Sequence, residues 1–280
     1  MTEFEPGIPI RVADTQIPVK RILGLNPGPM TGPGTNSYLI GKERLCLLDP
    51  GPKDDVQFEN FMAAIGDTKL DYILITHTHG DHSPGAAKLQ QATGAELVGL
   101  PAPDVAGQDK SFKPSKKWQD GDLVETDEYS IRLVHTPGHV SNHICFLLEE
   151  EQMLFTGDHV LQGTTSVILP PDGDMGDYLD SLAKLQRLPL QFLAPGHGSI
   201  MEDPAFELEK LIAHRLKREQ KIIDGLKELG ICDLDRLVLT VYDDVAEHLI
   251  PWAKRTLLAH LIKLERDDRV SSQDDNWQLH

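Results

Sequence analysis

The sequence predicts an α/β protein that ends in a separate helical part. Short apolar runs recur along roughly the first two hundred residues, and each stops at a turn signal and a polar residue, as strands do. Other segments carry apolar residues at three- and four-residue spacing, which indicates amphipathic helices. At 280 residues the chain can bury a large core, either as one domain or as two.

Five of the predicted strands lead directly to residues that can bind a metal ion. The runs are residues 44–48, 72–75, 131–134, 153–155 and 191–193, and the residues that follow them include Asp49, His77, His139, Asp158 and His197. Because strands of one sheet end at a shared edge, residues that are distant in sequence can converge there. The spacing therefore favours one site assembled from several loops.

Helices are predicted from capping residues and periodicity. Residues 55–65 fit a surface helix, and a second helix is expected to begin with Ser83 as its N-cap and Pro84 at its first position. Later in the chain, the pattern of residues 204–229 is helical, and Gly230 is a natural stop.

The last part of the chain predicts a winged helix-turn-helix. A short helix is expected from Asp233, another from Pro251 at a first helical turn, and a hairpin over residues 270–279. Three helices followed by a hairpin are typical of that motif. We therefore expect a catalytic domain at residues 1–203 and a winged-helix-like domain at residues 204–280.

The segment from Thr76 to His82 places three imidazoles and a carboxylate within six residues. This donor set suits zinc and its first-row neighbours, whereas calcium or magnesium prefers oxygen. The spacing is too tight for one helix face and fits a loop that leaves a strand. Five histidines and two aspartates exceed one tetrahedral zinc and suffice for two metals that share Asp158; they are His77, His79, Asp81, His82, His139, Asp158 and His197.

These spaced motifs resemble the metallo-β-lactamase superfamily. The resemblance implies an αββα sandwich, in which two sheets pack face to face with helices outside. It also implies that one metal is held by His77, His79 and His139. The second would be held by Asp81, His82 and His197, while Asp158 bridges the two metals. Asp49 would support the site without touching a metal.

The expected chemistry is metal-dependent hydrolysis. We expect two divalent ions, with zinc favoured and manganese or iron as alternatives. They would lower the pKa of a shared water, so that a bridging hydroxide attacks a carbonyl carbon or a phosphorus atom. Asp81 is the expected catalytic residue, since it would bind metal and orient the nucleophile. The chain carries no serine-nucleophile motif of the Gly-x-Ser-x-Gly or Ser-x-x-Lys type, which disfavours a serine mechanism.

Composition indicates an intracellular protein. The amino terminus lacks a basic and apolar leader pattern, and no apolar run approaches the length of a membrane span. The three cysteines are widely separated and imply no disulfide framework. We therefore expect cytoplasmic localisation and no membrane partner, and a homo-oligomer is left open.

Charge divides the chain unevenly. The formal net charge is −17, yet residues 210–269 hold 12 basic and 11 acidic residues. The acidic excess opposes general attraction to nucleic acid. Basic residues on the 204–229 helix, such as Lys217 and Lys221, could still form a local patch. Residues 113–118 form a basic loop, which is either solvated surface or faces the substrate.

The tail adds a narrower resemblance. Residues 214–223 and 252–265, with Gly163 to Thr165 and residues 176–182, are similar to the beta-lactamase-like protein 2 subgroup. That subgroup joins a metallo-β-lactamase core to a winged-helix tail, and its animal members cleave single-stranded RNA. The resemblance implies a phosphodiesterase or endoribonuclease-like activity on single-stranded RNA.

Three other functions are left open. A thioester or lactone hydrolase that resembles glyoxalase II would use the same ligands on a small anionic metabolite. An iron-dependent redox enzyme usually needs a flavin module, for which this chain has no room. A binding protein with a structural metal is disfavoured by the excess of ligands. Among the remaining histidines, His135 and His159 are not expected to be ligands, and His143 is a candidate supporting residue because it closely follows His139.

Overall fold

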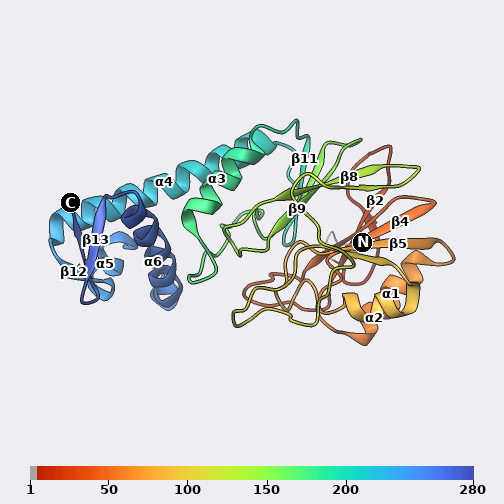
Figure 1. Ribbon diagram of the computed structural model, residues 1–280, viewed down its shortest axis with the longest axis horizontal. Coiled ribbons are helices and arrows are strands. Elements are labelled where there is room, and N and C mark those ends of the chain that lie inside the picture. The colour runs from red at the N-terminus through yellow and green to blue at the C-terminus, as the bar shows by residue number, and fades with distance from the viewer. Residues whose placement is uncertain (1–4) are drawn as a thin grey trace. The chain divides into compact units, whose positions relative to one another are not determined.

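The computed structural model describes residues 5–280 (Figure 1). Contacts within the chain divide it into two compact units. The first runs to Thr136 and includes Asn142–Ser166 and Leu188–Pro204, and the second comprises Pro137–Ser141, Val167–Arg187 and Ala205–His280.

The first unit contains a six-stranded mixed sheet. Its strands lie in the order β1 (Ile10–Arg11), β2 (Val19–Leu23), β3 (Asn36–Ile40), β4 (Arg44–Leu48), β5 (Lys69–Leu74) and β6 (Glu96–Val98). Pairing is antiparallel from β1 to β4 and parallel from β4 through β5 to β6. Helices α1 (Asp55–Ile65) and α2 (Ala86–Thr93) bury apolar side chains against one face of this sheet.

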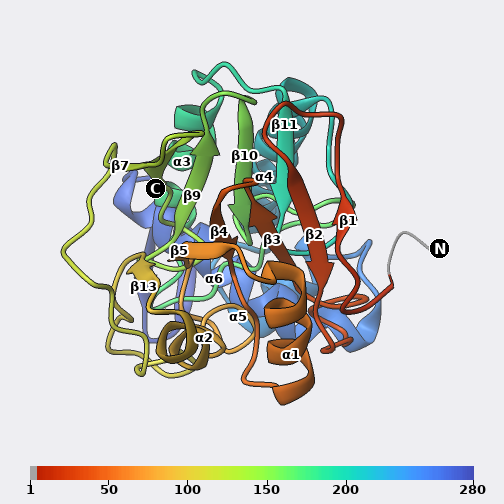
Figure 2. The same ribbon diagram turned by 90° about the vertical axis from the view of Figure 1, so that its right-hand side faces the viewer.

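A second, five-stranded sheet packs on the other face of the first sheet. Its order is β11 (Phe192–Pro195), β10 (Met153–Gly157), β9 (Ile144–Leu148), β8 (Ser130–His135) and β7 (Leu123–Glu125), and several of these strands are seen in Figure 2. Side chains from both sheets form one core; the rings of Tyr38 and Phe155, for example, have centroids 5.0 Å apart. The expected two-sheet sandwich is therefore present.

Burial on both faces explains the continuous apolar run of β4. Leu45 and Leu47 face the helices, whereas Cys46 and Leu48 face the second sheet. Successive side chains of a strand point to opposite faces, so a strand covered on both sides has no polar position. Such rigid strands give the loops that follow them fixed starting points.

The beginning of α2 differs from the expectation. The sequence predicts Ser83 as the N-cap, but the helix begins at Ala86 with Gly85 as its N-cap. The Ser83 hydroxyl instead donates a hydrogen bond to Asp109, at 2.8 Å, and the Ser83 carbonyl accepts one from the Ala86 amide. The Ser83 hydroxyl therefore bonds to a neighbouring loop and does not cap α2. By contrast, α1 has the expected bounds, and the Asp54 carboxylate caps it.

The second unit contains the helices α3 (Met175–Leu185), α4 (Pro204–Leu229), α5 (Leu234–Val241) and α6 (Ile250–Arg266), with a short 3-10 helix at Glu247–Leu249. A three-stranded sheet has the order β12 (Cys232–Asp233), β14 (Asn276–Leu279) and β13 (Val270–Gln273). The Asp233 carboxylate caps α5, and a hairpin turn at Asp274 and Asp275 joins β13 to β14. Apolar residues of α4, α5, α6 and the hairpin share one core. The expected three helices and hairpin are therefore present and share a core.

No helix among residues 5–280 combines the length and apolar character that crossing a membrane requires.

Candidate metal centre

The seven expected ligands fall into two groups. His77, His79 and His139 form one group, and Asp81, His82, Asp158 and His197 form the other. Within each group, one ligand atom of every residue lies within 4.8 Å of the others. Each residue follows a strand end, as the sequence predicts, so the loops after β5, β8, β10 and β11 supply the whole set.

The spacing in the second group suits a metal ion. His82 Nε2 lies 3.3 Å from Asp158 Oδ1 and 3.6 Å from Asp81 Oδ2. His197 Nε2 lies 3.4 Å and 3.3 Å from the same two oxygens. Two ligand atoms that are each about 2.1 Å from a tetrahedral zinc lie roughly 3.4 Å apart. The four atoms are therefore spaced as ligands of one ion.

Asp49 connects the strand edge to this group. Its carboxylate is fully buried and accepts hydrogen bonds from the Thr76 amide at 2.8 Å and the Thr76 hydroxyl at 2.6 Å. It also accepts one from His82 Nδ1, at 2.8 Å. Because Nδ1 is the donor, Nε2 of His82 is left to face the carboxylates of the second group. Asp49 therefore fixes the ring orientation of His82, one of the candidate ligands.

Three further histidines have the same orientation. The Thr76 hydroxyl donates to Asp49, so it accepts from His77 Nδ1, which is 3.1 Å away. His139 Nδ1 lies 2.6 Å from the Val167 carbonyl, and His197 Nδ1 lies 3.2 Å from the Gly34 carbonyl. A carbonyl can only accept, so Nδ1 carries the proton and Nε2 can bind a metal. Metal-binding histidines generally donate their other ring N–H in this way.

The electrostatics of the second group favour a cation. Burial raises the pKa of Asp81, but the charge of His82 and the hydrogen bond from His197 outweigh burial and lower this pKa to about 2. Burial lowers the pKa of His82, yet the Asp158, Asp81 and Asp49 carboxylates together raise it well above its usual value. The pKa of His197 is also raised, since Asp158 and Asp81 outweigh burial. The negative potential that attracts protons to these imidazoles would attract a divalent ion equally well.

The side chains of both groups are suited to bind divalent metal ions. The second group offers two imidazole nitrogens and two carboxylates, which is a zinc-type set. His82 Nε2 is buried and, among residues 5–280, faces only the oxygens of Asp158 and Asp81, at 3.3 and 3.6 Å. In the first group, His77 Nε2 and His79 Nδ1 lie 2.9 Å apart, which a shared cation would stabilise.

Other histidines lie outside both groups. His135 ends β8 and is half-buried, and His159 is fully buried; neither belongs to one of the two groups. His143 is fully buried and contacts the main chain of Asp158. Its closeness to His139 in sequence is the signal for a supporting role.

One supporting residue is not predicted by the sequence. The Asn36 side chain donates to the carbonyls of Pro195 and Gly198, at 2.9 and 2.8 Å, and so holds the loop that carries His197. The cluster of turn-forming residues before Asn36 indicates only a loop near the sheet edge. Because the two carbonyls are more than 150 residues away in the chain, no local sequence pattern indicates these hydrogen bonds.

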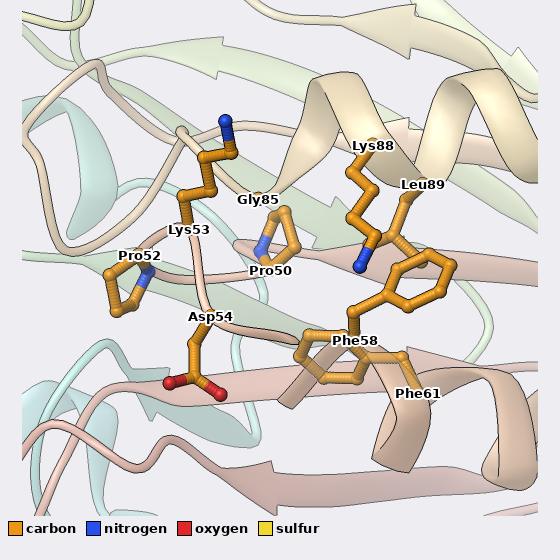
Figure 3. A pocket seen from close by; sticks show the side chains of 9 residues that line it. All are labelled: Pro50, Pro52, Lys53, Asp54, Phe58, Phe61, Gly85, Lys88 and Leu89. Carbon is orange, nitrogen blue, oxygen red and sulfur yellow. The ribbon is translucent and has the colours of Figure 1, made fainter. Parts of the chain in front are cut away.

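A separate hollow lies beside α1 and α2 (Figure 3). It is shallow and is lined mainly by proline, phenylalanine and lysine side chains, among them Pro50, Phe58 and Lys88. Lys88 Nζ is 4.0 Å from the centroid of the Phe58 ring and is paired with Asp55. None of the seven candidate ligands lines this hollow, so it is distinct from the metal centre.

Comparison with known proteins gives a consistent result. A family model described as the metallo-beta-lactamase superfamily matches residues 30–197, and one described as the beta-lactamase associated winged helix domain matches residues 234–277. The chain is 34% identical to the beta-lactamase-like protein 2 homolog of Drosophila melanogaster, over 94% of each chain. It is also 34% identical to the lactamase-like protein aptB of Emericella nidulans, over 95% of this chain and 86% of that protein.

Solved structures share the fold at lower identity. A beta-lactamase domain protein from Burkholderia ambifaria has a TM-score of 0.83 at 17% identity and covers 100% of this chain and 96% of its own. A metallo-beta-lactamase family protein from Thermus thermophilus has a TM-score of 0.76 at 21% identity, over 94% of this chain and 98% of its own.

Asp49→Asn should weaken metal binding by about 10- to 100-fold, because an amide cannot accept both the Thr76 and the His82 hydrogen bonds in the same way. Competition with a chromophoric chelator would measure this affinity. Asp71→Asn is the matched control, since Asp71 lies on β5 of the same sheet and pairs with Arg44 away from both groups. Equal affinities in wild type and Asp49→Asn would contradict the orienting role.

Removal of metal should leave the fold intact. The two apolar cores of the first unit contain none of the seven ligands, so their burial does not depend on an ion. Far-ultraviolet circular dichroism before and after dialysis against a chelator would test this. Loss of the secondary-structure signal on chelation would mean that the metals are structural.

Proposed function

The chain belongs to the metallo-beta-lactamase superfamily, and we propose that it is a hydrolase that uses two divalent metal ions, one in each ligand group. The observation that carries the proposal is the spacing of 3.3–3.6 Å between the histidine nitrogens and the carboxylate oxygens of the second group. Four histidines bond to an oxygen through Nδ1, so Nε2 is the nitrogen that each ring would offer to a metal, and this gives further support. We also propose a catalytic domain at residues 1–203 and a winged-helix domain at residues 204–280.

Zinc is the proposed metal, with manganese or iron as alternatives, because imidazole and carboxylate ligands suit all three. When bound, such ions supply Lewis acidity toward water and toward the electrophile of the substrate. Asp158 is proposed to bridge the two ions. Asp81 is the proposed catalytic residue: its carboxylate would bind metal and accept a hydrogen bond from the attacking water, and so aim the water's lone pair at the substrate.

The proposed reaction is phosphodiester hydrolysis in single-stranded RNA. A basic segment beside the ligand loop supports an anionic substrate. The Asp109 amide donates to the Thr78 carbonyl at 2.6 Å, and the Asp109 carboxylate accepts from the Ser83 hydroxyl at 2.8 Å. The segment that follows carries three exposed lysines with no ion pair to any described residue, namely Lys113, Lys116 and Lys117. Asp109 thus joins this segment to the ligand loop, while Ser115 holds its lysine-bearing part against Leu97 of β6. Three positive charges on such a segment can attract a phosphate backbone.

The tail offers less positive charge than its sequence suggests. Arg215 is buried, Arg218 pairs with Asp244, and Lys221 pairs with Asp243. Lys254 is likewise paired, with Asp235. The local basic patch that the sequence allows on α4 is therefore largely neutralised. This favours the lysine segment of the first unit as the region that attracts substrate.

A second candidate function follows from the net charge of −17. An acidic protein repels a long polyanion but tolerates a small one, for which three lysines suffice. The alternative is therefore a thioester or lactone hydrolase of the glyoxalase II type, which acts on a small anionic metabolite with the same ligands.

Purified protein with 5′-labelled single-stranded RNA and zinc or manganese tests the primary proposal. Wild type should cleave the RNA, and Asp158→Ala should lose nearly all cleavage and at least one metal, since ligands from one side cannot replace a bridge. Asp180→Ala, an exposed aspartate of α3, is the control. Intact RNA with wild type, together with turnover of thioester or lactone substrates, would favour the alternative.

Replacement of Lys113, Lys116 and Lys117 by alanine should raise KM for RNA several-fold and flatten its salt dependence, while kcat stays nearly constant. Each lost phosphate contact reduces the number of counterions released on binding. A triple alanine variant of Lys217, Lys227 and Lys254 on the second unit is the charge-matched control. Equal KM changes in the two variants would show that only net charge matters and would contradict a local substrate surface.

A further inference from the structure

His143 is a fully buried histidine that belongs to neither ligand group. Its Nε2 lies 3.3 Å from the main-chain nitrogen of Asp158, and its Nδ1 lies 2.9 Å from the Thr136 hydroxyl. The centroid of its ring is 5.2 Å from that of His77. One side chain therefore contacts the loops that carry two of the candidate ligands and the end of the strand that precedes a third.

The donor and the acceptor of each hydrogen bond around His143 can be assigned. The Asp158 amide can only donate, so Nε2 of His143 accepts and Nδ1 carries the proton. Nδ1 then donates to the Thr136 hydroxyl, which lies 3.2 Å from Cys145 Sγ. The thiol in turn donates to the Thr156 carbonyl, at 3.9 Å, because a carbonyl can only accept. This series of hydrogen bonds begins at the Asp158 amide and ends at the carbonyl of Thr156, which lies on β10 two residues before Asp158.

The backbone at Asp158 lies directly against His143. Gly157 has a φ of 46°, in the left-handed region that favours glycine. A Cβ at Gly157 would lie 2.8 Å from His143 Nε2 and 2.6 Å from the Thr76 hydroxyl oxygen. Only glycine fits where the turn passes over the imidazole of His143. This close packing fixes the main chain at Asp158 and therefore the position of the Asp158 Cα atom.

We infer that His143 is a positioning residue, which as the neutral Nδ1–H tautomer holds the main chain at Asp158 and so aims its carboxylate at the ligand groups. The inference rests on the proposed function in one respect, since it takes Asp158 as a metal ligand. Partners that orient a metal ligand are generally worth about 10- to 100-fold in metal affinity or activity. His143 acts through the backbone of the ligand, whereas Asp49 acts through the ring of His82.

Two substitutions separate the hydrogen bond from the volume of the ring. His143→Leu removes the acceptor and should weaken metal binding by about 10- to 100-fold and lower kcat, with KM little changed. His143→Gln places an amide oxygen near the position of Nε2, so it can still accept from the Asp158 amide and should recover most of the affinity. His260→Leu is the matched control, because His260 is also fully buried but lies on α6 of the second unit.

Metal affinity by chelator competition and the tautomer by nuclear magnetic resonance are the two readouts. In protein with 15N-labelled histidine, His143 should be neutral with the proton on Nδ1 at about pH 7, and the Asp158 amide should correlate with Nε2. A proton on Nε2, or equal affinities in wild type and His143→Leu, would overturn the inference. Metal binding by His143→Gln that is as weak as that of His143→Leu would overturn it as well.

The readouts also distinguish the inference from the proposed function. Wild type that binds no divalent metal would sink the proposed function, while the Asp158 amide and the His143 tautomer would still report whether the hydrogen bond exists. If His143→Leu does not fold, the tautomer in wild type and the affinity of His143→Gln decide the question. Retained fold and lost affinity in His143→Leu, with the control unchanged, would support the inference.

Discussion

The candidate metal centre depends on the hydrogen bonds that the buried carboxylate of Asp49 accepts. It lies at the end of β4, where it accepts hydrogen bonds from the amide and hydroxyl of Thr76 and from the ring of His82. A buried carboxylate is costly unless such donors satisfy it. The residues that stabilise Asp49 are therefore the residues whose positions it sets. Through Thr76 its influence extends to His77, so both ligand groups depend on one anion.

Other candidate ligands of the centre are also held by hydrogen-bond partners. Main-chain carbonyls orient His139 and His197, Asn36 holds the loop after β11, and His143 supports the turn after β10. Each of these ligands therefore has a partner outside its own loop. Within the first unit, two sheets with an apolar core between them hold Asn36 and His143 in place, and ligands that are held in place bind metal without a large cost of ordering.

Much of this arrangement could be predicted from the sequence because its signals are local. Apolar runs that stop at His77, Asp158 and His197 mark strand ends, and capping residues mark α1 and α5. The features that escaped prediction depend on distant partners. Ser83 does not cap α2 because Asp109 engages it. Two basic residues of α4, Arg218 and Lys221, pair with acidic residues more than twenty positions away. Neither Asn36 nor the hydrogen bonds of His143 follow a pattern that a strand or helix period would reveal.

We propose that one divalent ion binds each ligand group. Crystals of the zinc-loaded protein, measured on both sides of the zinc absorption edge, would test this proposal. Two anomalous peaks are expected, one among His77, His79 and His139, and one among Asp81, His82, Asp158 and His197. A single peak, or peaks away from these side chains, would contradict it.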